Sequence, residues 1–175
     1  MNYAIVLYMD DEKTALVSGM VKRLAPECGS YFCLGMVPHI TVCAFSSDDE
    51  SAVIEAAGRL AGKLSKGKIS IASIGVFNPS VLFLAPVVDS YLLKSSQTAN
   101  DAMREVSAIL NERYVPGSWV PHMTVAMKMS EEGLCKGFEN LLETFKPFRA
   151  VIDKAALIRS DETDPFQELA VYHLS

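Results

Sequence analysis

Apolar and polar positions follow two kinds of pattern along the chain, and the order of these patterns occurs twice. A short apolar run, typical of a buried strand, is followed each time by apolar residues at three- and four-residue spacing, typical of an amphipathic helix. The runs extend from Tyr3 to Met9 and from Val81 to Val88. The helical positions are Leu16, Val17, Met20, Val21 and Leu24 in the first half, and Leu92, Ala99, Met103, Val106 and Leu110 in the second.

A second helix and a further strand are predicted in each half. Acidic residues follow both Ser47 and Ser130, and a serine followed by carboxylates is typical of a helix N-cap and first turn. The helical apolar positions are Val53, Ile54, Ala57, Leu60, Ala61 and Leu64, and Leu134, Phe138, Leu141, Leu142 and Phe145. The strands that follow are Ile69 to Phe77, Phe148 to Ile158 and a final Glu168 to Leu174.

These patterns predict an α+β fold made of two β-α-β-α-β units. The units cover about 1–79 and 80–175, and they meet in a turn at Asn78-Pro79-Ser80. No Gly/Ser-rich linker separates them, so we expect one domain of two pseudo-repeats packed on each other. Short turns favour antiparallel pairing, which predicts two related, mainly antiparallel sheets with the helices outside.

Composition narrows the class of protein. Of the 175 residues, 50% are hydrophobic and 21% charged, which indicates a globular chain with a substantial core. The net charge of −5 argues against a partner that is a long nucleic acid. No apolar run is long enough to span a membrane, and no basic segment precedes the first run, so we expect no membrane association and a cytoplasmic location. The four cysteines form no Cys-x-x-Cys pair and are expected to be reduced.

The same five-residue motif occurs once in each half, 83 residues apart: Pro38-His39-Ile40-Thr41-Val42 and Pro121-His122-Met123-Thr124-Val125. Side chains alternate along a strand, so the His and Thr of each copy face the same way. Imidazole can act as base in one copy and acid in the other, while the Thr hydroxyls donate to phosphoryl oxygens. Packing alone is the alternative role, but it requires neither residue type, and the duplication favours catalysis by His39, Thr41, His122 and Thr124.

A metal site is the other alternative for these residues. Zinc would need a third protein ligand, and only Cys43 is placed by strand alternation on the same face as His39 and Thr41. A small buried thiol is the more common role for such a cysteine. We therefore expect no metal and no cofactor.

The two motifs resemble those of the two-histidine phosphoesterase superfamily, which includes 2′-5′ RNA ligase-like proteins and cyclic nucleotide phosphodiesterases. That family has two His-x-Thr/Ser-x motifs on a bilobal, pseudo-two-fold α+β fold whose sheets line a central cleft. The closing segment Leu157-Ile158-Arg159-Ser160 and the return strand containing Tyr172 are similar to the family's C-terminal hairpin. The resemblance implies a metal-independent phosphodiesterase acting on a 2′,3′-cyclic phosphate or 2′-5′-linked nucleotide.

Three further residues are candidates for substrate binding. Some family members carry an arginine three residues after the second threonine, where this chain has Met127 followed by Lys128. By strand alternation Lys128 faces the cleft, although a solvated strand end is an equal alternative. Trp119 and Tyr31 precede the motifs and could stack on a base, with packing as the alternative. The third histidine, His173, lacks the motif and is expected to be structural or at the surface.

The sequence therefore predicts a phosphoric diester hydrolase whose partner is a nucleotide or RNA terminus. Two alternatives stay open. The same cleft could bind a nucleotide or RNA end without turning it over, or it could join RNA ends through a 2′-5′ linkage by the reverse reaction.

Overall fold

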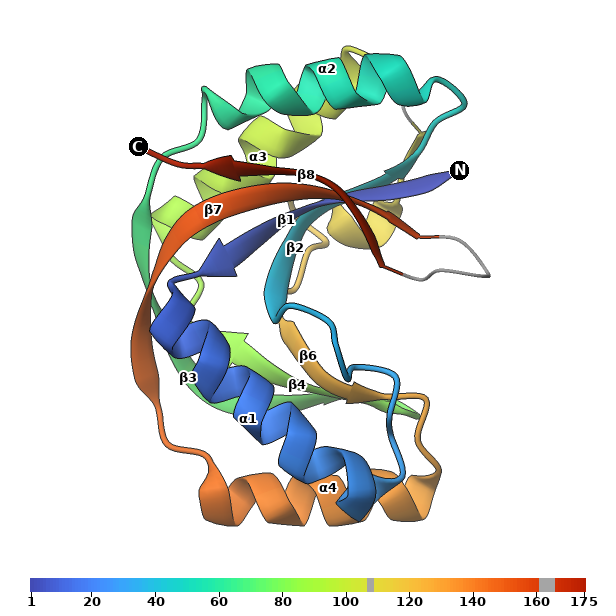
Figure 1. The fold of residues 1–175 in the computed structure, drawn as a ribbon, viewed down its shortest axis with the longest axis vertical. Coiled ribbons are helices and arrows are strands. Elements are labelled where there is room, and N and C mark those ends of the chain that lie inside the picture. Colours follow the sequence, from blue (N-terminus) through green and yellow to red (C-terminus); the bar gives the residue numbers. More distant parts are fainter. Residues whose placement is uncertain (107–108, 161–165) are drawn as a thin grey trace.

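Two pairs of helices enclose a strongly curved antiparallel sheet (Figure 1). The computed structural model describes residues 1–106, 109–160 and 166–175. The helices are α1 (Asp11–Cys28), α2 (Glu50–Ala61), α3 (Ser90–Arg104), α4 (Glu131–Thr144) and the short 3₁₀ helix η1 (Glu112–Tyr114). The strands are β1 (Asn2–Met9), β2 (His39–Ser46), β3 (Gly67–Phe77), β4 (Val81–Pro86), β5 (Ile109–Leu110), β6 (Met123–Met127), β7 (Phe148–Ser160) and β8 (Gln167–His173). The α+β fold is confirmed, and the predicted β-α-β-α-β order occurs in both halves, although in the second half β5 and η1 come between α3 and β6. Leu110, expected in the helix, lies in β5.

The strands pair in the order β5-β2-β1-β7-β3-β4-β6, and β8 adds to β7. We expected two separate sheets, but the hydrogen bonding is continuous. The reason is the length of β7: residues 148–152 pair with β3, and residues 152–160 pair with β1. The long strand thereby belongs to both lobes and joins them.

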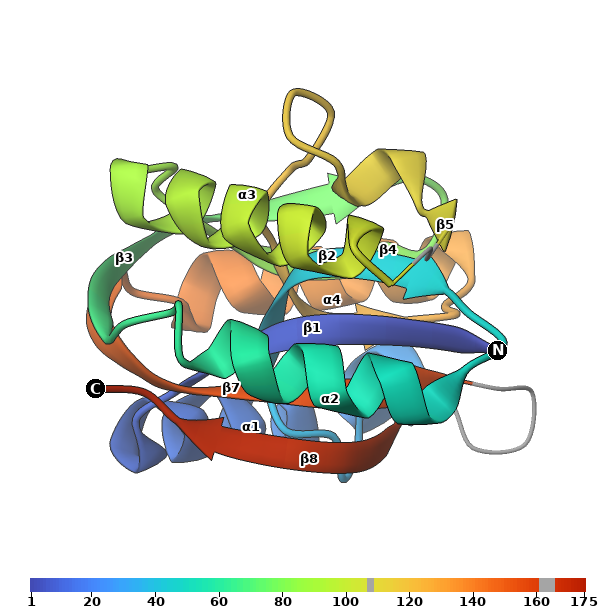
Figure 2. The same ribbon diagram turned by 90° about the horizontal axis from the view of Figure 1, so that it is seen from above.

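Each lobe combines strands with helices from both halves of the sequence. The His39 lobe, as we name it, contains β1, β2, β5, β8 and the end of β7, covered by α2 and α3 (Figure 2). The His122 lobe contains β3, β4, β6 and the start of β7, covered by α1 and α4. Helix α1 therefore packs in the lobe of the other half, as does α3. The boundary between pseudo-repeats near residue 79 stays a prediction about the sequence, because in space the halves are interleaved.

The helix boundaries show which local signals were read correctly. Ser130 caps α4, accepting a hydrogen bond from the Gly133 amide at 3.1 Å. At α2 the cap is Asp49, whose side chain accepts from the Ala52 amide, whereas the Ser47 hydroxyl, two residues earlier, accepts from the Asp49 amide. Three residues expected in the core are instead 42%, 39% and 63% exposed, because they lie at the edges of the apolar stripes: Leu16, Ile54 and Leu142.

No helix in the described part of the chain is long and apolar enough to cross a membrane.

Candidate active site

The two motif histidines have the same local geometry. His39 is the first residue of β2, and His122 immediately precedes β6; the proline before each is buried. The Nδ1 atom of His39 lies 2.8 Å from the Val37 carbonyl oxygen, and that of His122 lies 2.7 Å from the Val120 carbonyl oxygen. A carbonyl can only accept, so Nδ1 carries the proton in both rings. In the neutral imidazole, Nε2 is then the unprotonated nitrogen and is able to take a proton.

A β-bulge follows each motif at the equivalent residue. Thr41 is opposite Val6 and Cys43 is opposite Ile5, so Val42 is the extra residue in β2. Likewise Thr124 is opposite Phe83 and Ala126 is opposite Leu82, which makes Val125 the extra residue in β6. A bulge leaves one residue unpaired and reverses the side-chain alternation beyond it. The two copies of the motif therefore share a backbone irregularity as well as a sequence.

The bulges overturn two predictions that relied on simple alternation. Cys43 is buried in the core and faces away from His39 and Thr41, while Ala44 and Ser46 take over the cavity face. The buried-thiol interpretation of Cys43 is the correct one. In β6 the alternation now puts Met127, not Lys128, on the face of Thr124. Lys128 instead turns out of the strand with φ of 59°.

Aromatic rings surround both imidazoles. The His39 ring centroid lies 5.9 Å from that of Phe166 and 6.4 Å from that of Tyr8. The His122 ring lies 4.9 Å from Phe77, 5.6 Å from Phe83 and 6.0 Å from Tyr114.

This environment lowers the pKa of both histidines. Burial is the main cause in each case, partly offset by the carbonyl hydrogen bond, and the charge of His122 lowers the pKa of His39 further.

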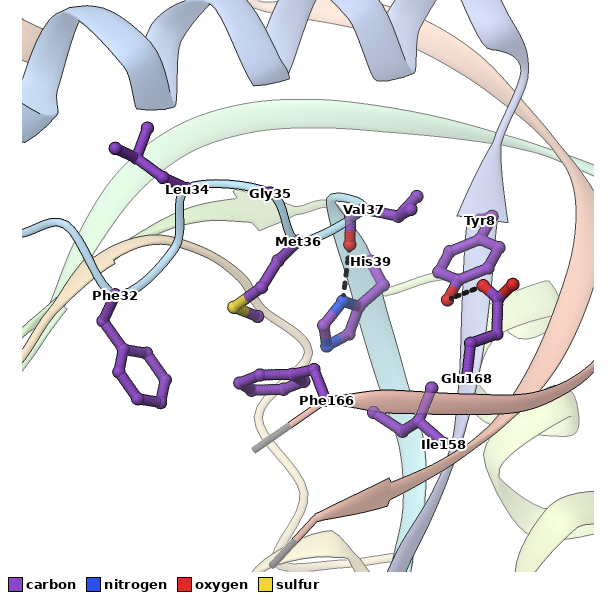
Figure 3. Close-up of a pocket in the computed structure, with 10 residues that line it drawn as sticks. All are labelled: Tyr8, Phe32, Leu34, Gly35, Met36, Val37, His39, Ile158, Phe166 and Glu168. Atoms are coloured by element: carbon purple, nitrogen blue, oxygen red, sulfur yellow. Dashed lines mark hydrogen bonds between the residues drawn. The ribbon is translucent and has the colours of Figure 1, made fainter. Parts of the chain in front are cut away.

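Two cavities adjoin His39, and both are bounded by His39, Ile158 and Phe166. The Phe32 cavity, of about 420 Å³, is also lined by Tyr8, Phe32, Leu34, Gly35, Met36, Val37 and Glu168 (Figure 3). The Asn111 cavity, of about 500 Å³, contains Thr41 and a polar group made of Asn2, Ser46, Asn111, Tyr114 and Ser160. Tyr114 in this second cavity packs on His122, which connects the cavity to the other motif.

The remaining predicted site residues lie at different places. Thr124 is half-buried opposite Phe83. The indole N–H of Trp119 donates to the Thr41 carbonyl at 3.0 Å while its ring packs on the core. Tyr31 is 61% exposed in the loop before β2. Lys128 does not line either cavity, but its Nζ lies 3.8 Å from the centroid of the Phe32 ring.

Several residues at the site had not been predicted from the sequence. Tyr8 is opposite His39 in the β1–β2 register, and the β8 end of the chain contributes Phe166 and Glu168 beside it. These segments are distant in sequence, so no local motif indicated them.

Within the described ranges, no group of three or more His, Cys, Asp or Glu side chains could hold a metal ion.

The sequence model of the 2′-5′ RNA ligase superfamily matches residues 13–164. The chain belongs to the 2′-5′ RNA ligase superfamily. This match confirms the resemblance seen in the two motifs. Among curated protein sequences, none matches this chain significantly.

Solved structures agree with the fold of this superfamily. E. coli LigT, crystallised with 3′-AMP, aligns with a TM-score of 0.70 at 13% identity, covering 99% of this chain and 98% of LigT. A protein solved as a phosphoesterase aligns with a TM-score of 0.71 at 13% identity, covering 99% of this chain and 98% of the phosphoesterase. The PDE domain of MHV ns2 aligns with a TM-score of 0.53 at 17% identity, covering 74% of this chain and 86% of that domain. At these identities the similarity is one of fold.

Gly75 provides a test of how His122 is supported. A Cβ at this position would lie 2.4 Å from the end of the Phe83 ring, which packs on both Phe77 and His122. We expect Gly75→Ala to destabilise the protein by about 1–3 kcal/mol, the usual cost of overpacking, and to lower turnover by displacing Phe83. Denaturant unfolding and kcat measure both effects.

Gly58→Ala is the matched control. Its Cβ would meet only the Tyr172 hydroxyl at 3.9 Å inside α2, so stability should stay equal or rise. Unchanged stability and kcat in Gly75→Ala would show that the Phe83 ring does not depend on the glycine.

Proposed function

We propose that this protein is a metal-independent phosphodiesterase that hydrolyses a 2′,3′-cyclic phosphate or a 2′-5′ linkage at a nucleotide or RNA terminus. The observation that carries the proposal is the matched pair of histidines, each held through Nδ1 so that Nε2 is left for proton transfer. Membership of the superfamily supports it. So do the ligands of LigT, which has been solved with 3′-AMP, ATP and NADP⁺.

The reaction needs one neutral and one protonated imidazole. Nε2 of the neutral histidine removes a proton from water as the water oxygen attacks phosphorus. The bond from phosphorus to one ribose oxygen breaks, and the protonated histidine gives its Nε2 proton to that oxygen. A phosphomonoester and a free hydroxyl result, and the two histidines have exchanged protonation states. The hydroxyls of Thr41 and Thr124 would donate to the non-bridging oxygens, where negative charge develops.

Two residues are proposed to contact the remainder of the substrate, and a third to act on it through the backbone of the site. Lys128, already placed against Phe32, would attract phosphate as a point charge. Trp119 would act through the Thr41 backbone to which it is bonded, and Tyr31 would contact the substrate from the exposed loop.

A substrate panel in the presence of EDTA tests the proposal. Purified protein is incubated with the four 2′,3′-cyclic nucleotides and with 2′-5′ dinucleotides, and products are separated by chromatography. We expect hydrolysis of at least one class with the rate unchanged by EDTA. Saturable binding without product would favour a non-catalytic binding module, and ligation of RNA ends without hydrolysis would favour the reverse reaction.

The pH dependence follows from the lowered histidine pKa values. kcat/KM reports the free enzyme and is highest midway between the pKa values of the acid and the base. Because both lie below the ordinary value, we expect a bell-shaped profile with its maximum below about pH 6.5. The profile of kcat should shift to higher pH, since a bound phosphate anion stabilises the imidazolium. A kcat/KM maximum above about pH 7.5 would contradict this assignment.

A further inference from the structure

The Phe32 cavity combines aromatic walls with one charged group. Phe32 and Phe166 pack edge to face, with ring centroids 5.8 Å apart, and Phe166 also packs on His39. Among the described residues that line the cavity, Glu168 is the only one with a charged side chain. Flat aromatic walls beside a catalytic imidazole suit a nucleobase, because every base can stack on a ring.

Glu168 is solvent-exposed at the edge of this cavity, and a hydrogen bond holds its carboxylate in place. The Tyr8 hydroxyl donates to Glu168 at 2.9 Å, and Tyr8 itself is 6% exposed (Figure 3). Burial and the bond to Glu168 raise the pKa of Tyr8, so it stays a donor at all relevant pH values. A carboxylate offers about four lone-pair positions, and Tyr8 fills one of them. The others can accept from a ligand.

The spacing of Phe166 and Glu168 along the chain suits a base. Phe166 immediately precedes β8 and Glu168 is the second residue of the strand; both line the cavity, whereas Gln167 between them does not. Two residues of a strand span about 7 Å. A purine stacked on Phe166 can therefore bring its Watson–Crick edge to Glu168 while its ribose phosphate lies toward His39.

A carboxylate distinguishes the four bases by their hydrogen-bonding edges. Guanine presents two adjacent donors, N1–H and the N2 amino group, which fit the two oxygens of one carboxylate. Adenine presents one donor beside an acceptor, as does cytosine, and uracil presents one donor between two acceptors. An acceptor placed against a carboxylate is repelled and leaves a buried polar group unpaired.

We propose that the Phe32 cavity is a guanine-selective subsite, in which Glu168, oriented by Tyr8, accepts hydrogen bonds from guanine stacked on Phe166. This inference rests on the proposed function and specifies its substrate class as guanosine 2′,3′-cyclic phosphate or a terminus ending in guanosine. Glu168 is the specificity-determining residue and Tyr8 its positioning residue.

Kinetics with the four 2′,3′-cyclic nucleotides test the subsite. We expect kcat/KM for the guanine nucleotide to exceed those for the others by about tenfold to a hundredfold, the usual effect of hydrogen bonds to a charged group. Glu168→Gln should remove most of this preference, since its amide can pair with adenine as well. Tyr8→Phe should reduce the preference less, by freeing the carboxylate to rotate.

Two controls match these variants. Tyr3→Phe removes another hydroxyl of β1 that donates to a carboxylate, that of Glu50 at 3.1 Å, and should leave base preference unchanged. Glu139→Gln removes one negative charge from the exposed face of α4 and should also leave base preference unchanged. Equal kcat/KM for all four bases, or a guanine preference that survives Glu168→Gln, would overturn the subsite and leave the proposed function intact.

Binding separates failure of the subsite from failure of catalysis. Calorimetric titration with guanosine and adenosine 2′-monophosphates requires no turnover. If no nucleotide is hydrolysed, binding of the guanosine compound that is tighter by about tenfold or more, and is lost in Glu168→Gln, would support the subsite alone. Equal affinity for both compounds would overturn it.

Discussion

Alanine at His39 or His122 is expected to lower kcat/KM by about two orders of magnitude or more, with the fold retained. Each substitution removes the one Nε2 that its lobe supplies for proton transfer. Both rings are half-buried, and the His39 ring lines the two cavities of its lobe, so we expect their loss to leave the cores of both lobes intact. Steady-state kinetics with the best substrate of the panel and circular dichroism measure the two outcomes.

The third histidine of the chain is the matched control. His173 is exposed at the end of β8, and His173→Ala should retain wild-type kcat/KM. The double variant lacking both motif histidines should be little worse than either single one, because acid and base act as one unit. Full turnover in both single variants, or an equal loss in His173→Ala, would remove the catalytic assignment.

The element order was predictable because it depends on local periodicity. The apolar run from Tyr3 to Met9 and the three- and four-residue spacing that follows became β1 and α1, and the second half repeated them as β4 and α3. Hydrophobic spacing reports which face of an element is buried, but not against which partner. The exchange of α1 and α3 between the lobes could therefore not be predicted from the hydrophobic spacing.

The predicted side-chain directions beyond each motif were wrong for a specific reason. Strand alternation assumes a regular ladder, and one inserted residue reverses every later position. Val42-Cys43 and Val125-Ala126 are adjacent apolar pairs where alternation would place one polar residue, and this was the signal of the bulges. The bulge in β6 in this way places Met127, and not Lys128, on the same face as Thr124.

The residues around His39 could not be assigned from sequence. Tyr8, Phe166 and Glu168 reach it only because β1 pairs with both β2 and β7, and β8 pairs with β7. Register over such separations is set by the packing of the whole sheet. The sequence thus indicated His39, Thr41, His122 and Thr124 as candidate reacting groups, a role that stays a prediction, but it did not indicate the walls of the cavities.

Asn100 connects the first bulge to the second motif. It is fully buried in α3, and its side-chain Nδ2 lies 3.2 Å from the Val42 carbonyl, 2.9 Å from that of Ser96 and 3.1 Å from that of Tyr114. Val42 is the bulged residue, whose carbonyl also accepts from the Ser96 hydroxyl at 3.0 Å. Tyr114 packs on His122. The amide must present its nitrogen here, since all three neighbours are acceptors.

Asn100→Asp is expected to be among the most destabilising single changes of similar size in the protein. The side chains of Asn and Asp have nearly the same shape, but a carboxylate oxygen would replace the Nδ2 donor and face three carbonyl oxygens without a counter-charge. We expect a loss of about 3–5 kcal/mol at neutral pH, typical of an uncompensated buried charge, measured by denaturant unfolding. kcat should fall too, because η1, which ends at Tyr114, loses its attachment to α3.

The pH dependence of this loss identifies its cause. Burial and the carbonyl oxygens would raise the pKa of the introduced carboxyl group above its value in the unfolded chain, so the folded variant binds more protons than the unfolded one. The stability difference from wild type should then widen as pH rises from about 4 upward and shrink toward about pH 4, where the protonated acid can donate to one carbonyl. Asn140→Asp, the same change at a half-buried position of α4, should stay within about 0.5 kcal/mol at every pH. A pH-independent loss in Asn100→Asp would indicate a packing effect in place of a buried charge, and wild-type stability would show that Asn100 does not join the two motifs.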